Sequence, residues 1–324
     1  MQKFNFGFVG CGKMAHAHAE VVKSIGHRIG AVVARPGSSH IDSFSSSFGV
    51  VKKFYALTKF MEELKRSPKE YDALVICAAW DAQEGILKQL LPFKKPVFVE
   101  KPAVLSMAAL KRIKTQRGTK NIYVGYNRRH YDFIPRLKNM IARGGLVCVD
   151  ILSADPWTML VKQRGARIKG HILHYYTAHI IDLMFYLLGD VKLNQGAVVR
   201  HQGKDSWVCQ LTAKKIPVQL KVLMDSPQNS YMKFFFKDKV VQLCPLETMV
   251  IYDRIERVQR NGRGIYRPGE RARMVTSDTF KPGLYNQMSY FLKNFVIHKN
   301  SSNEQFKQLE NVTAFCDELL QMRA

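Results

Sequence analysis

The stretch FNFGFVGCGKMAHAHAEVV, residues Phe4 to Val22, decides how the chain begins. Its apolar start predicts a buried strand, and the run after Gly12, free of Gly and Pro through Ser24, predicts a helix. Between them lies the spacing G-x-G-x-x-A. Here Gly10 permits the tight turn, Gly12 lets backbone approach a pyrophosphate, and Ala15 lets the helix pack closely on the strand. We therefore expect a dinucleotide-binding fold, with a purely structural glycine turn as the alternative.

The composition is that of a globular protein with room for two domains. The chain has 324 residues, 46% of them hydrophobic, and contains no low-complexity run. The cysteines are scattered without C-x-x-C pairs, which argues against a disulfide framework or a zinc site and predicts a reducing, cytoplasmic location. They are Cys11, Cys77, Cys148, Cys209, Cys244 and Cys316.

No segment predicts a membrane span. The most apolar helical run, Ile180–Leu188, is too short to cross a bilayer and contains Asp182. The N-terminus mimics a signal peptide through Lys3 and the apolar residues that follow. However, Asn5, Lys13 and intervening glycines interrupt that run, and cleavage would destroy the glycine loop. We therefore expect no membrane association.

The formal net charge of +24 predicts a field that attracts anions. Dinucleotides, nucleotide sugars and acidic sugars are anions of the right size. Nucleic acid is the alternative, but no nucleic-acid-binding motif is present, so we expect none to bind. The charge is equally compatible with a solubility feature.

Strand and helix signals alternate through the first 124 residues, which predicts a doubly wound parallel sheet. The run ALVICAA is continuously apolar, as a buried parallel strand requires. The expected strands after the first are Arg28–Ala34, Lys53–Tyr55, Ala73–Ala79, Val97–Val99 and Ile122–Val124. The expected helices are Ile41–Phe48, Thr58–Arg66, Ala82–Leu91 and Met107–Thr115.

From Gly125 the pattern changes to consecutive strands with short polar turns, which predicts a mainly antiparallel open sheet in an α+β domain. We therefore expect a Rossmann domain at 1–124 and a substrate-binding and oligomerisation domain at 125–324. The expected strands are Trp207–Ala213, Val218–Asp225, Tyr231–Phe236, Val240–Cys244 and Thr248–Tyr252. The expected helices are Phe133–Ala142, His171–Leu188, Tyr285–His298 and Glu304–Met322.

The segment Arg254–Arg273 contains seven arginines together with Asn261-Gly262 and Pro268-Gly269. We expect a solvated loop between the sheet and the next helix, since charged loops are common. Contact with a substrate phosphate or with an oligomer partner is the alternative.

The residues after the second strand favour NADP over NAD. An Asp or Glu about 20 residues past the glycines would bind the ribose 2′-hydroxyl of NAD. Here Ala34 takes that position and Arg35 follows, while Ser38 and Ser39 add donors for a 2′-phosphate. We expect NADP(H), with NAD(H) as the second choice. The alternative is that Arg35 is only an exposed turn residue.

At Glu100-Lys101-Pro102 the chain resembles the Gfo/Idh/MocA family, relatives of glucose–fructose oxidoreductase and inositol dehydrogenase. The resemblance covers essentially the whole chain and rests on several motifs in order. His18 takes the family's histidine position after the glycine loop. VGYNRRHYDFIPRLK (124–138) is similar to its entry into the second domain, and GHILHYYTAHIIDLMFYLLG (170–189) to its active-site helix.

The resemblance implies a nicotinamide-dependent oxidoreductase acting on a sugar, a sugar derivative or a nucleotide-linked sugar. It assigns catalysis to Lys101 and His179, with Tyr175 assisting, and makes Pro102 the candidate for a cis peptide. The implied cofactor contacts are Gly10, Gly12, Lys13, Met14, Arg35, Ser38, Ala78, Ala79, Glu100, Lys101 and Asn127. The implied substrate contacts are Lys101, Tyr126, Arg128, His171, Tyr175 and His179.

The chain departs from the family pattern at three positions. Tyr175 replaces the first Asp of the active-site helix, Ala79 replaces a proline, and Gln83 replaces a histidine. A dinucleotide-binding homologue that is catalytically inactive and regulates a partner is therefore the rival hypothesis.

Hydride transfer to or from an alcohol carbon needs a proton acceptor or donor, and the pKa range of histidine suits His179 for this. Lys101 would bind the reacting oxygen, and Tyr175 would hold the imidazole or donate a proton. A packed core histidine is the alternative for His179. Helical spacing also places His171, His174 and Asp182 near His179, as in a zinc site. Spacing alone is weak support, and we expect no metal.

Two apolar strand runs, Val218–Met224 and Met232–Phe236, predict a sheet buried on both faces. Helices of the chain would cover one face and a second copy the other. We therefore expect a homo-oligomer, a dimer or a tetramer.

Overall fold

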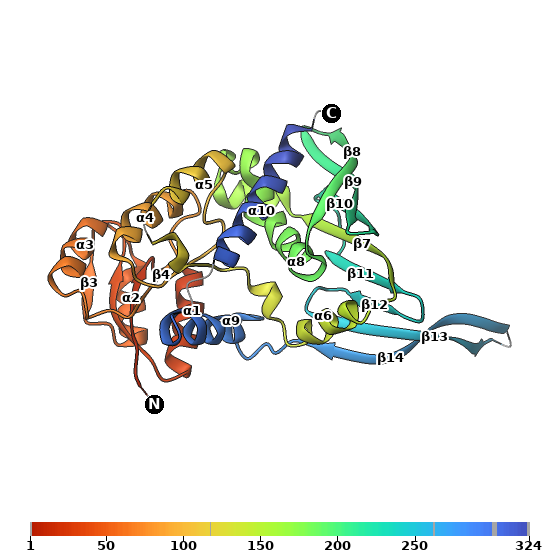
Figure 1. The fold of residues 1–324 in the computed structure, drawn as a ribbon, viewed down its shortest axis with the longest axis horizontal. Coiled ribbons are helices and arrows are strands. Elements are labelled where there is room, and N and C mark those ends of the chain that lie inside the picture. Colours follow the sequence, from red (N-terminus) through yellow and green to blue (C-terminus); the bar gives the residue numbers. More distant parts are fainter. Residues whose placement is uncertain (1, 117, 262, 300–302, 323–324) are drawn as a thin grey trace. The chain divides into compact units, whose positions relative to one another are not determined.

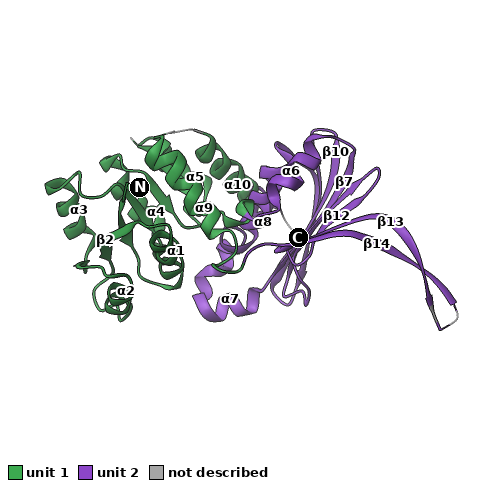
Figure 2. Cartoon of the chain, turned by 90° about the horizontal axis from the view of Figure 1, so that it is seen from below, with its two compact units in different colours: residues 1–130, 278–317 green, residues 131–277, 318–324 purple. Residues whose placement is uncertain are grey.

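The computed structural model describes residues 2–116, 118–261, 263–299 and 303–322 (Figure 1). Its chain divides into two compact units, residues 1–130 with 278–317, and residues 131–277 with 318–324 (Figure 2). The sequence placed both C-terminal helices in the second domain. In the structure, α9 (Leu284–Phe291) and most of α10 (Asn303–Gln321) fall in the first unit instead.

The first unit holds a six-stranded parallel sheet in the order β3-β2-β1-β4-β5-β6. This order confirms the predicted doubly wound fold. The central strands are apolar and buried on both faces, as helices on both sides require. The strands are β1 (Asn5–Val9), β2 (Arg28–Val33), β3 (Lys52–Phe54), β4 (Ala73–Ile76), β5 (Val97–Val99) and β6 (Ile122–Val124).

The helices of the first unit pack on this sheet through apolar stripes. In α1 the buried stripe includes Ala15, His18 and Val22, and Ala15 has no exposed surface, as close packing on β1 requires. Helix α9 lies beside α1 and buries Met288 and Phe291 in the same core. The other bounds are α1 (Lys13–Ser24), α2 (His40–Phe48), α3 (Leu57–Arg66), α4 (Gln83–Leu90) and α5 (Met107–Lys114).

The second unit holds an eight-stranded sheet in the order β14-β13-β12-β11-β7-β10-β9-β8. Only β7 and β10 pair in parallel, so the sheet is mainly antiparallel, as predicted. Sequence reasoning missed β7 and β8. The strands are β7 (Leu146–Asp155), β8 (Val191–His201), β9 (Lys204–Ala213), β10 (Ile216–Met224), β11 (Tyr231–Phe236), β12 (Val240–Leu243), β13 (Thr248–Arg260) and β14 (Arg263–Val275).

The two sides of this sheet differ. The cross-strand row Leu220, Ile151, Met232 and Leu243 is buried, and we call this the covered side. Most of the neighbouring positions point the other way and are at least partly exposed, although Leu152 is buried, and Lys221 and Asp150 form an ion pair there at 2.6 Å. We call this the open side. The helices of the unit are α6 (Ile134–Ala142), α7 (Trp157–Arg164) and α8 (Ala178–Leu188).

The expectation of a loop over Arg254–Arg273 is wrong. The segment belongs to the long antiparallel pair of β13 and β14, whose last paired residues are Arg260 and Arg263. An Asn-Gly pair between two strands is a strong hairpin signal, because both residues accept positive φ. Asn261 has φ 52°, whereas Gly262 lies outside the described residues.

The described part of the chain contains no helix of the length and hydropathy that a bilayer crossing demands.

Candidate functional site

The predicted cofactor residues of the first unit gather at one edge of its sheet. Each follows the carboxyl end of a strand: the glycine loop follows β1, Arg35 follows β2, Ala78 and Ala79 follow β4, and Lys101 follows β5. Neighbouring β1 and β4 connect to opposite sides of the sheet, and ligands bind at such a switch point in open α/β sheets. The structure therefore places these residues along one edge of the sheet.

The two glycines of the loop serve different purposes. Gly10 has φ 109°, and a Cβ there would lie 2.2 Å from the carbonyl oxygen of Cys77, so the fold itself requires glycine. A Cβ on Gly12 would meet no atom within 4 Å. Nothing in the protein demands glycine at that position, which instead opens space at the start of α1.

The start of α1 suits an anion. The helix begins at Lys13, which is exposed, with Met14 half-buried beside it. No side chain caps its free N–H groups, and no acidic residue lies in its first turn. Open space, free donors and the helix dipole together fit the pyrophosphate of a dinucleotide.

The segment after β2 forms a tight turn beside the glycine loop. The backbone N–H of Ser38 donates to the carbonyl of Arg35 at 3.2 Å, and Gly37 supplies φ 74°. The Ser38 hydroxyl lies 3.4 Å from the thiol of Cys11. The Arg35 side chain is exposed. The turn thus places an arginine and a hydroxyl at the edge where the ribose of a dinucleotide would lie.

A buried contact between a histidine and a carboxylate, which the sequence did not predict, lies at the end of β5. His18 from α1 and Glu100 approach within 2.6 Å, and both are almost wholly buried. Burial alone would raise the pKa of the Glu100 carboxyl, but the hydrogen bond with His18 and the charges of Lys101 and Lys281 outweigh it. The pKa of Glu100 therefore lies below its usual range, and the group stays ionised.

The pair is connected to the backbone of Lys101. The Oε2 atom of Glu100 accepts a hydrogen bond from the backbone N–H of Lys101 at 3.2 Å. A Cβ on Gly125 would lie only 3.0 Å from the other carboxylate oxygen, Oε1. The Lys101–Pro102 peptide is cis, as predicted. Glu100 is thus a buried support for Lys101, whose side chain is half-buried.

Three further candidates follow β6. Tyr126 and Asn127 are buried, and Arg128 is half-exposed. The Asn127 amide donates to the carbonyl of Pro282 at 2.9 Å. That amide group therefore has a structural partner within the first unit.

The remaining candidates, His171, Tyr175 and His179, belong to the second unit, and each is half-buried. The predicted continuous α-helix over 171–188 is wrong in its first half. Residues 166–171 form a 3₁₀ turn, Leu173–Thr177 form a π-helical turn, and α8 begins only at Ala178. Because these turns have different periods, the α-helical spacing that aligned His171 with His179 does not apply.

The sequence also missed a buried network that fastens this helix to the sheet. Asp155, at the end of β7, has no exposed surface. It accepts a hydrogen bond from Ser153 at 2.5 Å and another from the Thr177 hydroxyl at the end of the π-helical turn. In the sequence, the signal that could have indicated this network was an apolar strand ending in Asp155.

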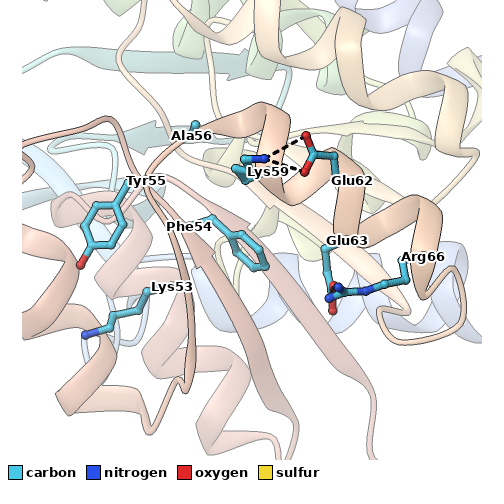
Figure 3. Close-up of a pocket in the computed structure, with 8 residues that line it drawn as sticks. All are labelled: Lys53, Phe54, Tyr55, Ala56, Lys59, Glu62, Glu63 and Arg66. Atoms are coloured by element: carbon cyan, nitrogen blue, oxygen red, sulfur yellow. Dashed lines mark hydrogen bonds and ion pairs between the residues drawn. The ribbon is translucent and has the colours of Figure 1, made fainter.

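Two other features do not coincide with the predicted site. No group of three or more His, Cys, Asp or Glu in the described ranges is arranged to hold a metal ion. A surface hollow of about 550 Å³ lies between β3 and α3, and includes Phe54, Lys59 and Glu62 (Figure 3). None of its lining residues is a predicted site residue, and its Lys59 and Glu62 pair with each other.

Comparison with known proteins agrees with this geometry. Residues 4–127 match the model of the Gfo/Idh/MocA family, described as an oxidoreductase family with an NAD-binding Rossmann fold. The N-terminal part of the chain, residues 4–127, thus matches this family. The resemblance drawn from its motifs is thereby confirmed.

Two curated proteins align with part of this chain. Myo-inositol 2-dehydrogenase of Thermotoga maritima is 26% identical over 189 residues, 57% of this chain and 54% of that protein. The uncharacterized oxidoreductase YrbE of Bacillus subtilis is 24% identical over 190 residues, 56% of this chain and 53% of that protein. The chain therefore spans about half the length of the curated relatives it matches.

Solved structures match over nearly the full length. UDP-N-acetylglucosamine 3-dehydrogenase GnnA from Acidithiobacillus ferrooxidans superposes with TM-score 0.72 at 15% identity, over 98% of this chain and 97% of that one. A myo-inositol dehydrogenase from Corynebacterium glutamicum gives TM-score 0.70 at 15% identity, over 98% and 96%. At these identities the match establishes the fold of both units, and the fold alone.

Proposed function

We propose that this protein is an oxidoreductase that transfers a hydride between NADP(H) and a sugar, a sugar derivative or a nucleotide-linked sugar. One observation carries the proposal. The open space over Gly12, at the uncapped start of α1, shares the carboxyl edge of the sheet with the supported Lys101. The names of the matched relatives, an inositol dehydrogenase and a UDP-sugar dehydrogenase, support the substrate class.

The residues at the sheet edge fit a dinucleotide. The glycine loop with Lys13 and Met14 would hold the pyrophosphate, and Arg35 with Ser38 the 2′-phosphate. Ala78, Ala79, Glu100, Lys101 and Asn127 complete the proposed contacts. When bound, the nicotinamide group accepts or donates the hydride.

The chain's own residues would manage the proton and the substrate. We assign to Lys101 the binding of the reacting oxygen and to His179 the proton transfer, with Tyr175 orienting the imidazole. Tyr126, Arg128 and His171 are the proposed further substrate contacts. The net charge of +24 favours an anionic substrate such as a nucleotide-linked sugar.

Cofactor preference is tested by calorimetric titration with NADP⁺ and NAD⁺. An arginine–phosphate hydrogen bond contributes about 1.5–3 kcal/mol, or one to two decades in affinity. We expect wild type to prefer NADP⁺ and Arg35→Ala to lose most of that preference. Equal or tighter binding of NAD⁺ by wild type would refute the assignment.

Catalysis is tested by turnover with inositols, sugars and UDP-sugars. Loss of a positioned proton-transfer group costs about 10²–10⁴ in rate. We expect Lys101→Ala and His179→Ala each to lose at least about two decades while still binding NADP⁺, and Tyr175→Phe to lose less. Near-normal turnover in Lys101→Ala, or no hydride transfer by wild type, would favour a regulatory homologue instead.

We also propose that the protein forms a homo-oligomer through the open side of the second sheet and is located in the cytoplasm. None of the six cysteines, all in the described part of the chain, takes part in a disulfide, which supports a reducing compartment. Partly exposed apolar side chains on the open side, such as Phe235, Val240 and Leu223, support self-association. A monomer at micromolar concentration in a sedimentation experiment would count against it.

A further inference from the structure

Beyond the sheet, β13 and β14 continue as a ribbon of only two strands (Figures 1 and 2). Strand β12 pairs with β13 only over residues 249–252. We call the described residues that follow, 253–261 and 263–270, the arm. A two-stranded hairpin is at best marginally stable in water, because neither of its faces is covered. The arm is therefore a segment whose stability calls for a partner surface.

The pairing register divides the arm into two sides, since residues directly opposite in an antiparallel ladder share a side. On the first side Ile255 lies opposite Pro268, and Arg257 lies opposite Tyr266. On the second side Glu256 lies opposite Arg267, and Val258 lies opposite Ile265.

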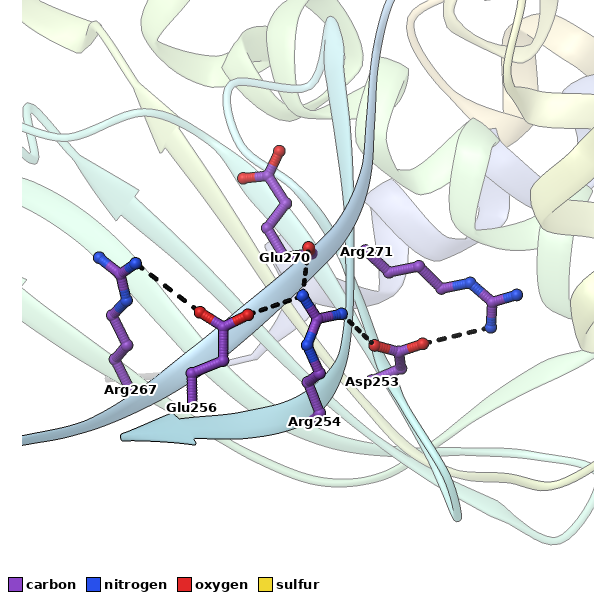
Figure 4. A network of polar contacts seen from close by, with 6 residues as sticks. All are labelled: Asp253, Arg254, Glu256, Arg267, Glu270 and Arg271. Atoms are coloured by element: carbon purple, nitrogen blue, oxygen red, sulfur yellow. Dashed lines mark hydrogen bonds and ion pairs between the residues drawn. The ribbon is translucent and has the colours of Figure 1, made fainter. Parts of the chain in front are cut away.

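The second side and the base of the arm carry a network of ion pairs (Figure 4). Arg254 contacts Glu256 at 2.6 Å and Asp253 at 3.3 Å. Arg267 reaches Glu256 at 3.7 Å, and Arg271 reaches Asp253 at 3.2 Å. These arginines already have carboxylate partners within the chain. The network therefore weakens the case for a polyanionic partner, which would compete with those carboxylates.

The first side is different. Ile255 is 77% exposed and Tyr266 is 71% exposed. Arg257 lies between them and has no ion pair with any residue in the described part of the chain. Tyrosine and arginine are enriched at the centres of protein–protein interfaces, and the exposed Ile255 adds apolar surface beside them.

The register also connects this side of the arm to the sheet. Val250 and Tyr252 belong to the open side, because Met249 and Ile251 are on the covered side. Around Tyr252 the pairing skips one residue on each strand, Asp253 on β13 and Arg271 on β14. After this irregularity the side chains of β13 again alternate between the two sides, and Ile255 lies on the open side. The first side of the arm therefore continues the open side of the sheet.

We propose that the first side of the arm packs against a second copy of this chain, extending the interface formed by the open side of the sheet. The eight strands without the arm lie about 4.8 Å apart and average about 25 Å in length, so their open side offers about 840 Å². A stable dimer buries about 800 Å² on each partner, so the open side is large enough for a second copy, and the arm extends that surface. In a two-fold arrangement the same surface serves both copies, and Arg257 of one copy is then available to Tyr266 of the other.

This inference rests on the proposed self-association and is independent of the proposed chemistry. Sedimentation velocity compares wild type with two double variants of equal charge. Ile255→Glu with Tyr266→Glu alters the first side, and Val258→Glu with Ile265→Glu alters the second. We expect a dimer or tetramer for wild type and for the second-side variant. For the first-side variant we expect at least about 100-fold weaker association.

The outcomes separate the proposals. A monomeric wild type overturns both self-association and the role of the arm. If wild type is an oligomer and both double variants weaken its association equally, or neither weakens it, only the proposed role of the arm is overturned. Binding of a fluorescent 20-base-pair DNA duplex by a monomeric wild type, lost in the first-side variant, would assign the arm to nucleic acid instead. None of these results bears on hydride transfer, which the turnover assay measures separately.

A second measurement covers the case in which the first-side variant fails to fold. Amide hydrogen exchange of wild type is recorded at several protein concentrations. We expect peptides within 253–270 to gain protection as concentration rises, because association covers the arm. Protection that is independent of concentration while the oligomer forms would contradict the proposal.

Discussion

His18 and Glu100 form a contact between α1 and the end of β5, 82 residues apart in sequence. Glu100 in turn accepts the backbone N–H of Lys101. A buried carboxylate that loses its donor is costly, since its desolvation is then uncompensated. The pair therefore couples the stability of the first unit to the position of Lys101.

Because the pKa of folded Glu100 lies below its ordinary value of 4.5, its ionised form stabilises the fold above that pH. This contribution is lost as pH falls through the lowered folded pKa. We expect Glu100→Gln to be less stable than wild type at pH 7 and to show a shallower loss of stability below about pH 4.5. Denaturant titrations from pH 7 to pH 3 measure this. Glu20→Gln, at an exposed position, is the control. If Glu100→Gln loses stability below pH 4.5 as steeply as wild type, Glu100 is not the group responsible.

Substitution of His18 tests the same pair from the other side. We expect His18→Leu to lose about 2–4 kcal/mol of stability at pH 7, because it leaves a buried carboxylate without its donor. His18→Gln keeps a donor and should lose less. Equal losses of stability in the two variants would indicate that His18 acts through packing. One packing partner is Phe98, whose ring centroid lies 4.7 Å from that of His18 in an edge-to-face arrangement.

At the scale of elements, the turn between β1 and α1 offers a matched pair of glycines. We expect Gly10→Ala to lose about 2 kcal/mol or more, because its φ of 109° and the Cys77 carbonyl both exclude a Cβ. Gly12→Ala should fold with nearly wild-type stability yet bind NADP⁺ at least about tenfold more weakly. Thermal melts and calorimetric titration separate the two effects. If Gly12→Ala binds NADP⁺ normally, the pyrophosphate does not lie there.

The start of α8 depends on the link from Thr177 to Asp155. We expect Thr177→Val to destabilise the protein by about 1–3 kcal/mol, since it removes a donor from a buried carboxylate. Thr177→Ser retains the hydroxyl and should recover most of the loss. Urea unfolding of the three proteins measures both effects, and a failure of serine to recover stability would assign the role of Thr177 to its methyl group.

At the scale of the whole molecule, the net charge of +24 should make anion binding sensitive to salt. The Debye length falls from about 10 Å at 0.1 M to about 3 Å at 1 M ionic strength. We expect NADP⁺ affinity to fall at least about tenfold over this range, with a smaller fall in Arg35→Ala. Binding of uncharged adenosine is the control and should change little. A salt-independent affinity for NADP⁺ would mean that the charge has no part in cofactor binding.

A feature can be predicted from the sequence when the interactions that determine it act between residues close together in the chain. The glycine spacing, the alternating apolar runs and the E-K-P motif all act within about 20 residues. They were sufficient to predict the parallel sheet and the resemblance to the family whose model matches residues 4–127. Asn261-Gly262 was an equally local signal for a hairpin, but the arginines around it favoured a loop over the two strands. That error came from weighing charge above turn chemistry.

The sequence by itself thus determined the strand–turn–helix at Gly10 and Gly12, because backbone sterics and periodicity act between near neighbours. Only the tertiary structure decided the rest. It placed α9 against α1, paired His18 with Glu100, joined Thr177 to Asp155 and set the π-helical turn before α8. Apolar periodicity shows that a face is buried but not what buries it. A buried polar group can find its partner anywhere along the chain, so these contacts emerge only when the fold brings distant segments together.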